Sequence, residues 1–207
     1  MIQFLPYIKE NKFLNKLPDH ILLKGLKDAS LQAIKPKTRL YEEGSVDDNF
    51  YFIIKGIIKA YFNHNQEQVN LLYFRTGDVI SNYRYMYLQE SSFLTYEAVV
   101  PVTVIRVEKF TIYSLLEEYP HLNVTYRETF ASTLSRYEDK FRSLLCYPAR
   151  ERYIKFVEQF GADISCFTQK EIASYLGITP ETLSRVKRGV KPEFLPIKVL
   201  ENYDVYN

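Results

Sequence analysis

The sequence predicts an α+β protein with a β-rich N-terminal part, one long helix and a C-terminal pair of short helices. Three observations support this prediction. Short runs of β-branched and aromatic residues, separated by turn residues, lie between positions 40 and 110. Apolar residues then recur every three or four positions between 120 and 145, as in an amphipathic helix. Helix-capping residues and a glycine turn mark two further helices between 168 and 188.

The N-terminal part begins with residues 19–34, which we expect to form one or two short helices. Strands follow, with turn residues such as Gly56 between them. They are expected at residues 50–54, 57–62 and 69–74, with a last strand or pair at 98–107. Strands at this spacing are typical of a β-sandwich, roll or barrel.

The long helix carries one apolar stripe whose successive steps are three or four residues. Such a stripe packs either on the β-rich part or on the same helix of a second copy, because coiled coils use a similar spacing. The residues alone do not decide between these alternatives. The stripe consists of Tyr126, Phe130, Leu134, Tyr137, Phe141 and Leu144.

The C-terminal part has the signals of a helix-turn-helix. Thr168 and Glu171 have the spacing of a capping box, and Gly177 provides the turn after the first helix. Thr179 caps a second helix, and Pro180 occupies its first position, where a missing N–H costs nothing. An amphipathic helix that begins after Pro148 and ends at Gly161 precedes this motif.

The second helix also has the chemistry to read DNA. Glu181 suits the amino group of cytosine, and Arg185, one turn later, suits O6 and N7 of guanine. The alternative is a purely structural role, in which the two side chains form an i,i+4 ion pair. Residues 168–191 hold five bases and two acids, a charge of +3, although the whole chain has only +2. The predicted DNA-contacting residues are Thr168, Gln169, Thr179, Pro180, Glu181, Thr182, Ser184, Arg185, Lys187 and Arg188.

Composition excludes several other classes of protein. Hydrophobic residues make up 46% of the 207, which is typical of a folded protein. Two cysteines are too few for a disulfide framework or a four-thiolate iron–sulfur cluster, and three dispersed histidines disfavour haem. We therefore expect no metal, no catalytic residues and no membrane span. With no signal peptide visible, the expected location is the cytoplasm.

Several segments together resemble the Crp/Fnr superfamily of bacterial transcription regulators. They are residues 41–44, 50–56 and 75–78 in the β-rich part, and residues 168–185 in the C-terminal part. The resemblance implies an antiparallel β-roll of the double-stranded β-helix or jelly-roll type, followed by a long dimerisation helix and a winged helix-turn-helix. It places a cyclic-nucleotide-binding-like sensor at 1–118, the dimerisation helix at 119–146 and the DNA-binding domain at 147–207.

The resemblance also implies a homodimer, in which the apolar stripe of the long helix is the seam and the second short helices read a palindromic site in double-stranded DNA. RNA polymerase and a small-molecule effector are further partners that it suggests. Many family members have an arginine where Pro180 stands, so the half-site is expected to differ. Only 19 residues follow Arg188, so the wing is expected to be short, altered or absent.

The sensor departs from members that bind cyclic AMP. Ser81 and Asn82 stand where those members have Gly-Glu, and residues 91–97 contain no arginine to hold the cyclic phosphate. The effector is therefore unknown, and cyclic AMP is not expected. The predicted effector-pocket residues are Asn82, Tyr83, Arg84, Tyr85, Tyr87, Phe93 and Tyr96.

The three alternating tyrosines among these residues have two interpretations. They line an aromatic pocket for a planar or apolar effector, with Arg84 as an anion partner. Alternatively, they share one face of an extended segment and plug a vestigial site, which is the favoured interpretation because aromatic stripes are usually packing.

Two functions from other classes compete with DNA regulation. The first is a cyclic-nucleotide-binding-like module that senses a ligand and acts through protein partners. The second is a cupin-like β-roll enzyme, which would need clustered histidines; His20, His64 and His121 are dispersed along the sequence.

Overall fold

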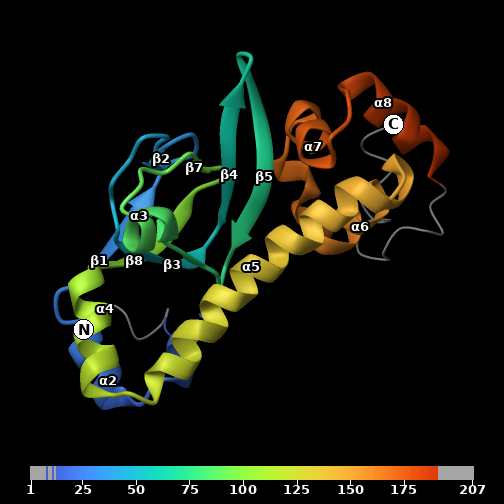
Figure 1. The fold of residues 1–207 in the computed structure, drawn as a ribbon. Helices are drawn as coiled ribbons and strands as arrows, with labels where there is room; N and C mark the ends of the chain where they lie inside the picture. The colour runs from blue at the N-terminus through green and yellow to red at the C-terminus, as the bar shows by residue number, and fades with distance from the viewer. Residues whose placement is uncertain (1–7, 9–10, 12, 191–207) are drawn as a thin grey trace. The chain divides into compact units, whose positions relative to one another are not determined.

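The computed structural model describes residues 8, 11 and 13–190, which divide into two compact units. Unit 1 comprises residues 1–62 and 72–135, and unit 2 comprises residues 63–71 and 136–207. In chain order, the elements are η1 (Leu14–Lys16), α2 (Asp19–Gly25), β1 (Ser30–Ile34), β2 (Arg39–Tyr41), β3 (Phe50–Lys55), β4 (Ile57–His64), β5 (Glu67–Arg75), β6 (Val79–Ile80), α3 (Tyr83–Leu88), β7 (Thr95–Ala98), β8 (Val102–Val107), α4 (Lys109–Glu118), α5 (Leu122–Cys146), α6 (Ala149–Phe160), η2 (Gly161–Cys166), α7 (Gln169–Leu176) and α8 (Pro180–Gly189) (Figure 1).

The strands form two four-stranded sheets, and the predicted antiparallel β-roll is confirmed. Sheet A has the order β1-β8-β3-β6, and sheet B has the order β2-β7-β4-β5. The β1–β8, β3–β8, β2–β7 and β4–β7 pairs are all antiparallel. The inner faces of the two sheets meet through aromatic rings, since Tyr41 of sheet B packs edge-on against Tyr51 of sheet A at 5.2 Å between centroids.

The outer face of sheet A carries the second apolar layer of unit 1. Side chains alternate along β3, so Phe50, Phe52 and Ile54 lie on the face opposite to Tyr51. They form one buried cluster with Leu14 of η1 and with residues of β8. Residues of α2, α4 and α5 pack against this cluster, which places these helices over sheet A.

Two expectations about unit 1 are corrected, and a third, which allowed two alternatives, is decided. Residues 30–34 are not helical but form β1, which pairs with β8 about 70 residues later. Of the last strand or pair expected at residues 98–107, the structure shows two strands, because β7 ends at Ala98 and β8 begins at Val102. The tyrosine-rich segment is the helix α3 rather than an extended segment. The Asn82 Oδ1 atom accepts the Tyr85 N–H at 3.2 Å and caps the helix, which ends at Gln89 with φ 58°.

Unit 2 is built on aromatic packing between its helices. Phe156 and Phe160 of α6 lie 4.5 Å apart between ring centroids, and Phe156 also contacts Phe167 and Tyr175. Ser174 of α7 further donates its hydroxyl to the Gln68 carbonyl, at 2.7 Å, in the hairpin segment that belongs to this unit. These contacts hold α7 against α6 and against the hairpin segment that contains Gln68.

Candidate functional site

Local hydrogen bonds explain why residues 168–189 fold as two helices with a tight turn. Thr168 Oγ1 accepts the Glu171 N–H at 3.2 Å, and Glu171 Oε2 accepts the Thr168 N–H at 2.9 Å, which completes the capping box. Gly177 has φ 62°, and the Ile178 N–H bonds to the Ala173 carbonyl at 3.0 Å, as in a Schellman motif. The predicted helix-turn-helix is therefore present.

The second helix of the motif has a buried face and an uncovered polar face. Thr179 caps α8 by accepting the Thr182 N–H at 3.2 Å. Leu183 is fully buried against the rest of unit 2. Glu181 and Arg185 are exposed and lie one turn apart near the N-terminal end of α8. This arrangement holds the backbone of α8 while leaving its polar side chains available to a partner.

The structure places all ten predicted DNA-contacting residues at the surface, eight of them exposed and Thr182 and Lys187 half-buried. Arg185 donates to Thr182 Oγ1 at 3.2 Å. Within the described residues, the alternative of an i,i+4 ion pair with Glu181 is not formed. The pKa of Glu181 is lowered, chiefly by a hydrogen bond from its own backbone N–H and then by the Thr179 hydroxyl. Lys191 and the predicted wing lie outside the described residues.

The apolar stripe of α5 is uncovered over most of its length. Leu134 is 49% exposed and Phe141 is 65% exposed, which is unusual for such large apolar side chains. Tyr126 differs, because it packs inside unit 1 against Phe50, with ring centroids 6.1 Å apart. Phe130 is partly covered within the same unit, at 5.1 Å from Tyr83. The first residues of the stripe therefore pack within unit 1, whereas Leu134 and Phe141 are exposed to solvent in the single chain.

Sequence reasoning missed a buried lysine on the same helix. Lys140 of α5 donates to the Tyr175 carbonyl, and its ammonium lies 3.3 Å from the centroid of the Tyr175 ring. Burial, and secondarily the charge of Arg152, lower the pKa of Lys140 to about 7. A signal was present in the sequence, because Lys140 lies three residues after Tyr137 and four before Leu144, at the spacing of the stripe itself.

The seven predicted effector-pocket residues do not converge on one cavity. Asn82 is buried as the cap of α3, while Tyr83 and Tyr87 pack against Phe130 of α5. The remaining members divide between the surface and the interior. Arg84 forms an ion pair with Glu90 and stacks on the half-exposed Phe93, whereas Tyr96 lies inside the roll. Tyr85 is half-buried on α3.

Aromatic side chains fill the inside of the roll between the two sheets. Tyr96 packs against Tyr41 at 5.5 Å and against Phe74 at 5.7 Å between centroids. All three are buried, as is Tyr51, whose pKa is raised to about 12, mainly by burial. Neutral rings occupy this space and Arg84 is engaged at the surface, so these residues do not fit a cyclic nucleotide, whose phosphate needs a buried cation.

The described part of the chain also offers little to other cofactors. It contains no group of three or more His, Cys, Asp or Glu side chains placed to hold a metal ion. Among its helices, none combines the length and the apolar character required to cross a bilayer. Cys146 and Cys166 are both free thiols.

Comparison with known proteins places this geometry in context. Residues 31–119 match the family model described as the cyclic nucleotide-binding domain. No curated protein matches the chain. Among solved structures, FixK2 from Bradyrhizobium japonicum has a TM-score of 0.67 and 20% identity, covering 76% of this chain and 82% of that one.

Two further solved structures are similar over more of the chain. A CooA mutant from Carboxydothermus hydrogenoformans has a TM-score of 0.64 and 17% identity, with 87% and 88% of the two chains covered. A putative regulator of the Crp/Fnr family from Eubacterium rectale has a TM-score of 0.66 and 14% identity, with 94% and 98% covered. The expected resemblance is confirmed: residues 31–119 match the cyclic nucleotide-binding domain, and the chain has the fold of these solved structures, one of which is described as a Crp/Fnr family regulator.

Proposed function

We propose that this protein is a homodimeric transcription regulator of the Crp/Fnr type that reads a palindromic DNA site through α8. The observation that carries the proposal is the uncovered polar face of α8, where Glu181 and Arg185 lie one turn apart while Leu183 anchors the helix. The N-terminal half of such a helix enters the major groove, where a guanidinium pairs with guanine. The role is regulatory rather than catalytic, and its expected location is the cytoplasm.

The outward part of the α5 stripe supports the homodimer. Leu134, Phe141 and Leu144 recur at steps of seven and three, and each is more than a third exposed in the single chain. Pairing two such helices would bury these side chains in a coiled-coil seam. A twofold dimer would present two α8 helices, which matches a palindromic site.

The effector in this proposal is not cyclic AMP. Tyr41, Tyr96 and Phe74 fill the inside of the roll, and residues 91–97 carry no arginine. Thermal denaturation with cyclic AMP or cyclic GMP is therefore expected to show no rise in melting temperature. A saturable rise at micromolar nucleotide would contradict this part of the proposal.

The central test is selection of binding sites from randomised duplex DNA. The wild-type protein is expected to select a palindrome. Arg185→Ala is expected to weaken binding to that site by roughly 5- to 150-fold and to relax the choice of base at one position in each half-site. Lys170→Ala is the matched control, because it removes one exposed positive charge from α7 without touching α8.

Two results would refute the proposal for DNA. One is weak wild-type binding that is equal for every sequence, and the other is equal loss of selectivity in the two variants. The dimer has its own test by sedimentation. Leu134→Glu is expected to yield monomers, whereas Glu128→Lys, on the opposite side of α5, is expected to leave the dimer intact. A monomeric wild type would refute the seam.

A further inference from the structure

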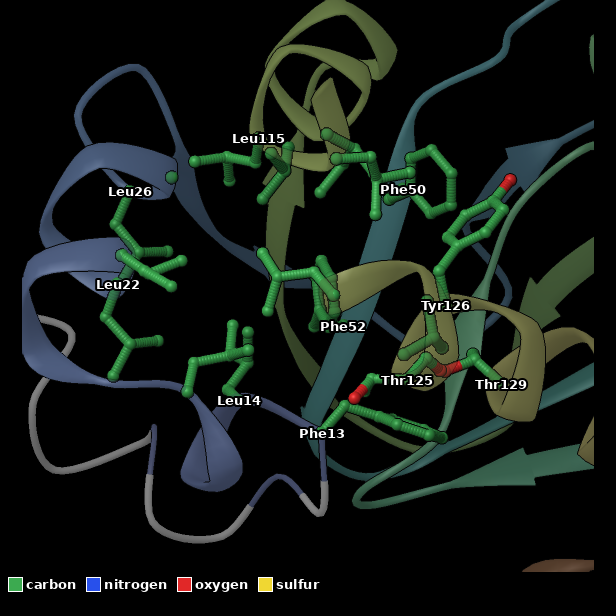
Figure 2. Close-up of a pocket in the computed structure, with 18 residues that line it drawn as sticks. Phe13, Leu14, Leu22, Leu26, Phe50, Phe52, Leu115, Thr125, Tyr126 and Thr129 are labelled. Atoms are coloured by element: carbon green, nitrogen blue, oxygen red, sulfur yellow. The ribbon is translucent and has the colours of Figure 1, made fainter. Parts of the chain in front are cut away.

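Unit 1 contains an apolar cavity that lies outside the roll. Its volume is about 100 Å³, and it lies between the outer face of sheet A and the helices α2, α4 and α5 (Figure 2). Leu22 of α2 and Leu26, which directly follows α2, face Phe52 of β3 across it, and Tyr126 of α5 closes another side. None of the seven predicted effector-pocket residues lines this cavity.

The walls exclude a charged or strongly polar ligand. None of the 18 lining residues in the described part of the chain carries a charge. Two of the three polar side chains are already engaged: the Thr129 hydroxyl donates to the Thr125 carbonyl at 2.8 Å, and the Tyr126 hydroxyl is hydrogen-bonded to that of Tyr87. Burial raises the pKa of Tyr126, so its hydroxyl stays neutral. Water would find few partners here, as in other apolar cavities that stay dry.

A buried helical glycine, Gly25, is one of the residues that line the cavity. Gly25 belongs to the last turn of α2, and a Cβ added there would lie 2.9 Å from Leu115 Cδ1 of α4. Leu115 itself lines the cavity. An unfilled apolar cavity lowers stability, because its lining atoms lose packing partners on one side. A small apolar occupant would restore those contacts.

We propose that this cavity binds a small, neutral, apolar molecule of about the size of one aromatic ring or a short alkyl chain. The volume sets an upper limit on the size, because the cavity has about two thirds of the ~150 Å³ of a cavity lined by Leu, Ile and Phe that holds benzene. The absence of charged lining residues sets the polarity. Binding at this site does not depend on the function proposed above. Only the further step, in which the ligand acts as the effector of a DNA-binding regulator, rests on that proposed function.

The position of the cavity links its occupancy to α5. Leu122, Thr125, Tyr126 and Thr129, from the first turns of α5, all line it. Tyr126 connects the cavity to α3 through the hydroxyl of Tyr87. A ligand in the cavity would contact these residues of α5, and the exposed stripe of the same helix is the proposed dimer seam. Ligand binding could therefore change the position of α5 and so the dimer.

Thermal denaturation of the full chain with benzene as the probe tests the proposal without DNA. Benzene at about five times its dissociation constant is expected to raise the melting temperature by about 2–4 °C. Benzenesulfonate, which has the same ring with a charge, is expected to cause no rise. Equal shifts with both compounds, or no shift with benzene at millimolar concentration, would overturn the proposal.

Three variants locate the binding. Leu22→Phe fills the cavity and is expected to abolish the benzene shift, while Leu22→Ala enlarges it and is expected to keep the shift. Leu23→Ala alters an exposed neighbour that does not line the cavity, so its shift should equal that of the wild type. If Leu22→Phe proves unstable, ligand-observed NMR with Leu22→Ala and Thr129→Leu gives the same comparison. Wild-type benzene binding by Leu22→Phe or Thr129→Leu would refute the site.

DNA titrations with and without benzene form a separate arm. If the chain binds benzene and selects DNA, but benzene leaves DNA affinity unchanged, the ligand site stands and its role as effector is refuted. If the chain binds benzene but selects no DNA, the proposed function fails and the site remains. The two failures therefore give different results.

Discussion

Lys140, the buried lysine of α5, is expected to make the stability of unit 2 depend on pH. Its ammonium faces the Tyr175 ring and carbonyl of α7 and the guanidinium of Arg152 on α6, and the pKa of Lys140 falls from 10.5 to about 7. Below pH 7, both the folded and the unfolded state carry the proton, so the folded state bears the full cost of a buried charge. Between pH 7 and 10.5, only the unfolded state keeps the proton, so stability rises with pH.

The magnitude follows from the shift. A difference of 3.5 pH units, from 10.5 to about 7, corresponds to about 5 kcal/mol, or about 1.4 kcal/mol for each pH unit. Lys140→Met removes this cost and loses one hydrogen bond to the Tyr175 carbonyl, which is worth roughly 1 kcal/mol. The variant is therefore expected to be more stable than the wild type by about 3–4 kcal/mol at pH 6.

Urea denaturation at pH 6, 7, 8 and 9, followed by circular dichroism, measures the effect. The free energy of unfolding of the wild type should rise towards that of Lys140→Met as the pH increases. Lys170→Met, which removes an exposed lysine of α7, controls for the loss of a surface charge. Parallel curves for the wild type and Lys140→Met across this range would refute the reasoning, because they would mean that Lys140 keeps its proton.

Two further predictions concern the turn of unit 2 and the contact between α3 and α5. Gly177→Ala is expected to lower stability by about 1–2 kcal/mol, because φ is 62° there and an added Cβ would lie 2.8 Å from Leu144 Cδ2; urea denaturation measures it, and an unchanged midpoint would contradict the strain. Tyr126→Phe is expected to cost about 0.5–1.5 kcal/mol, because it removes the hydrogen bond to Tyr87. A double-mutant cycle with Tyr87→Phe checks it, and additive effects would show that the bond contributes nothing.

The helix-turn-helix was predictable from the sequence because its determinants are local. The capping box of Thr168 and Glu171, the left-handed Gly177 and the Thr179 cap each act within three or four residues. Such signals depend little on the rest of the fold. The capping and turn interactions predicted for this motif are therefore found in the structure.

The sequence-based predictions were wrong where contacts with distant residues decide the structure, or where the spacing of side chains was misleading. Residues 30–34 form a strand because they pair with β8, a partner that no local pattern reveals. In α3, the alternation of tyrosines imitates a strand, while the Asn82 cap and the buried Met86 belong to a helix. Reading Tyr83 and Tyr87 as an i,i+4 pair would have given the correct face.

The apolar cavity was beyond sequence reasoning for a related reason. Its walls come from η1, α2, α4, α5 and three strands, and each residue alone looks like ordinary core. Only the three-dimensional arrangement shows that these residues surround a cavity. For Lys140, the spacing along α5 was visible in the sequence, but its contacts with Tyr175 and Arg152 were not, because these residues lie on other helices.

The aromatic filling of the roll has a consequence for how this fold holds its shape. A diffusible ligand inside a β-roll leaves when its concentration falls, so the order it confers depends on supply. Tyr41, Tyr96 and Phe74 are attached to the chain, so their effective concentration does not change with dilution. Because Tyr41 of sheet B also packs against Tyr51 of sheet A, this aromatic cluster joins the two sheets without an exchangeable ligand.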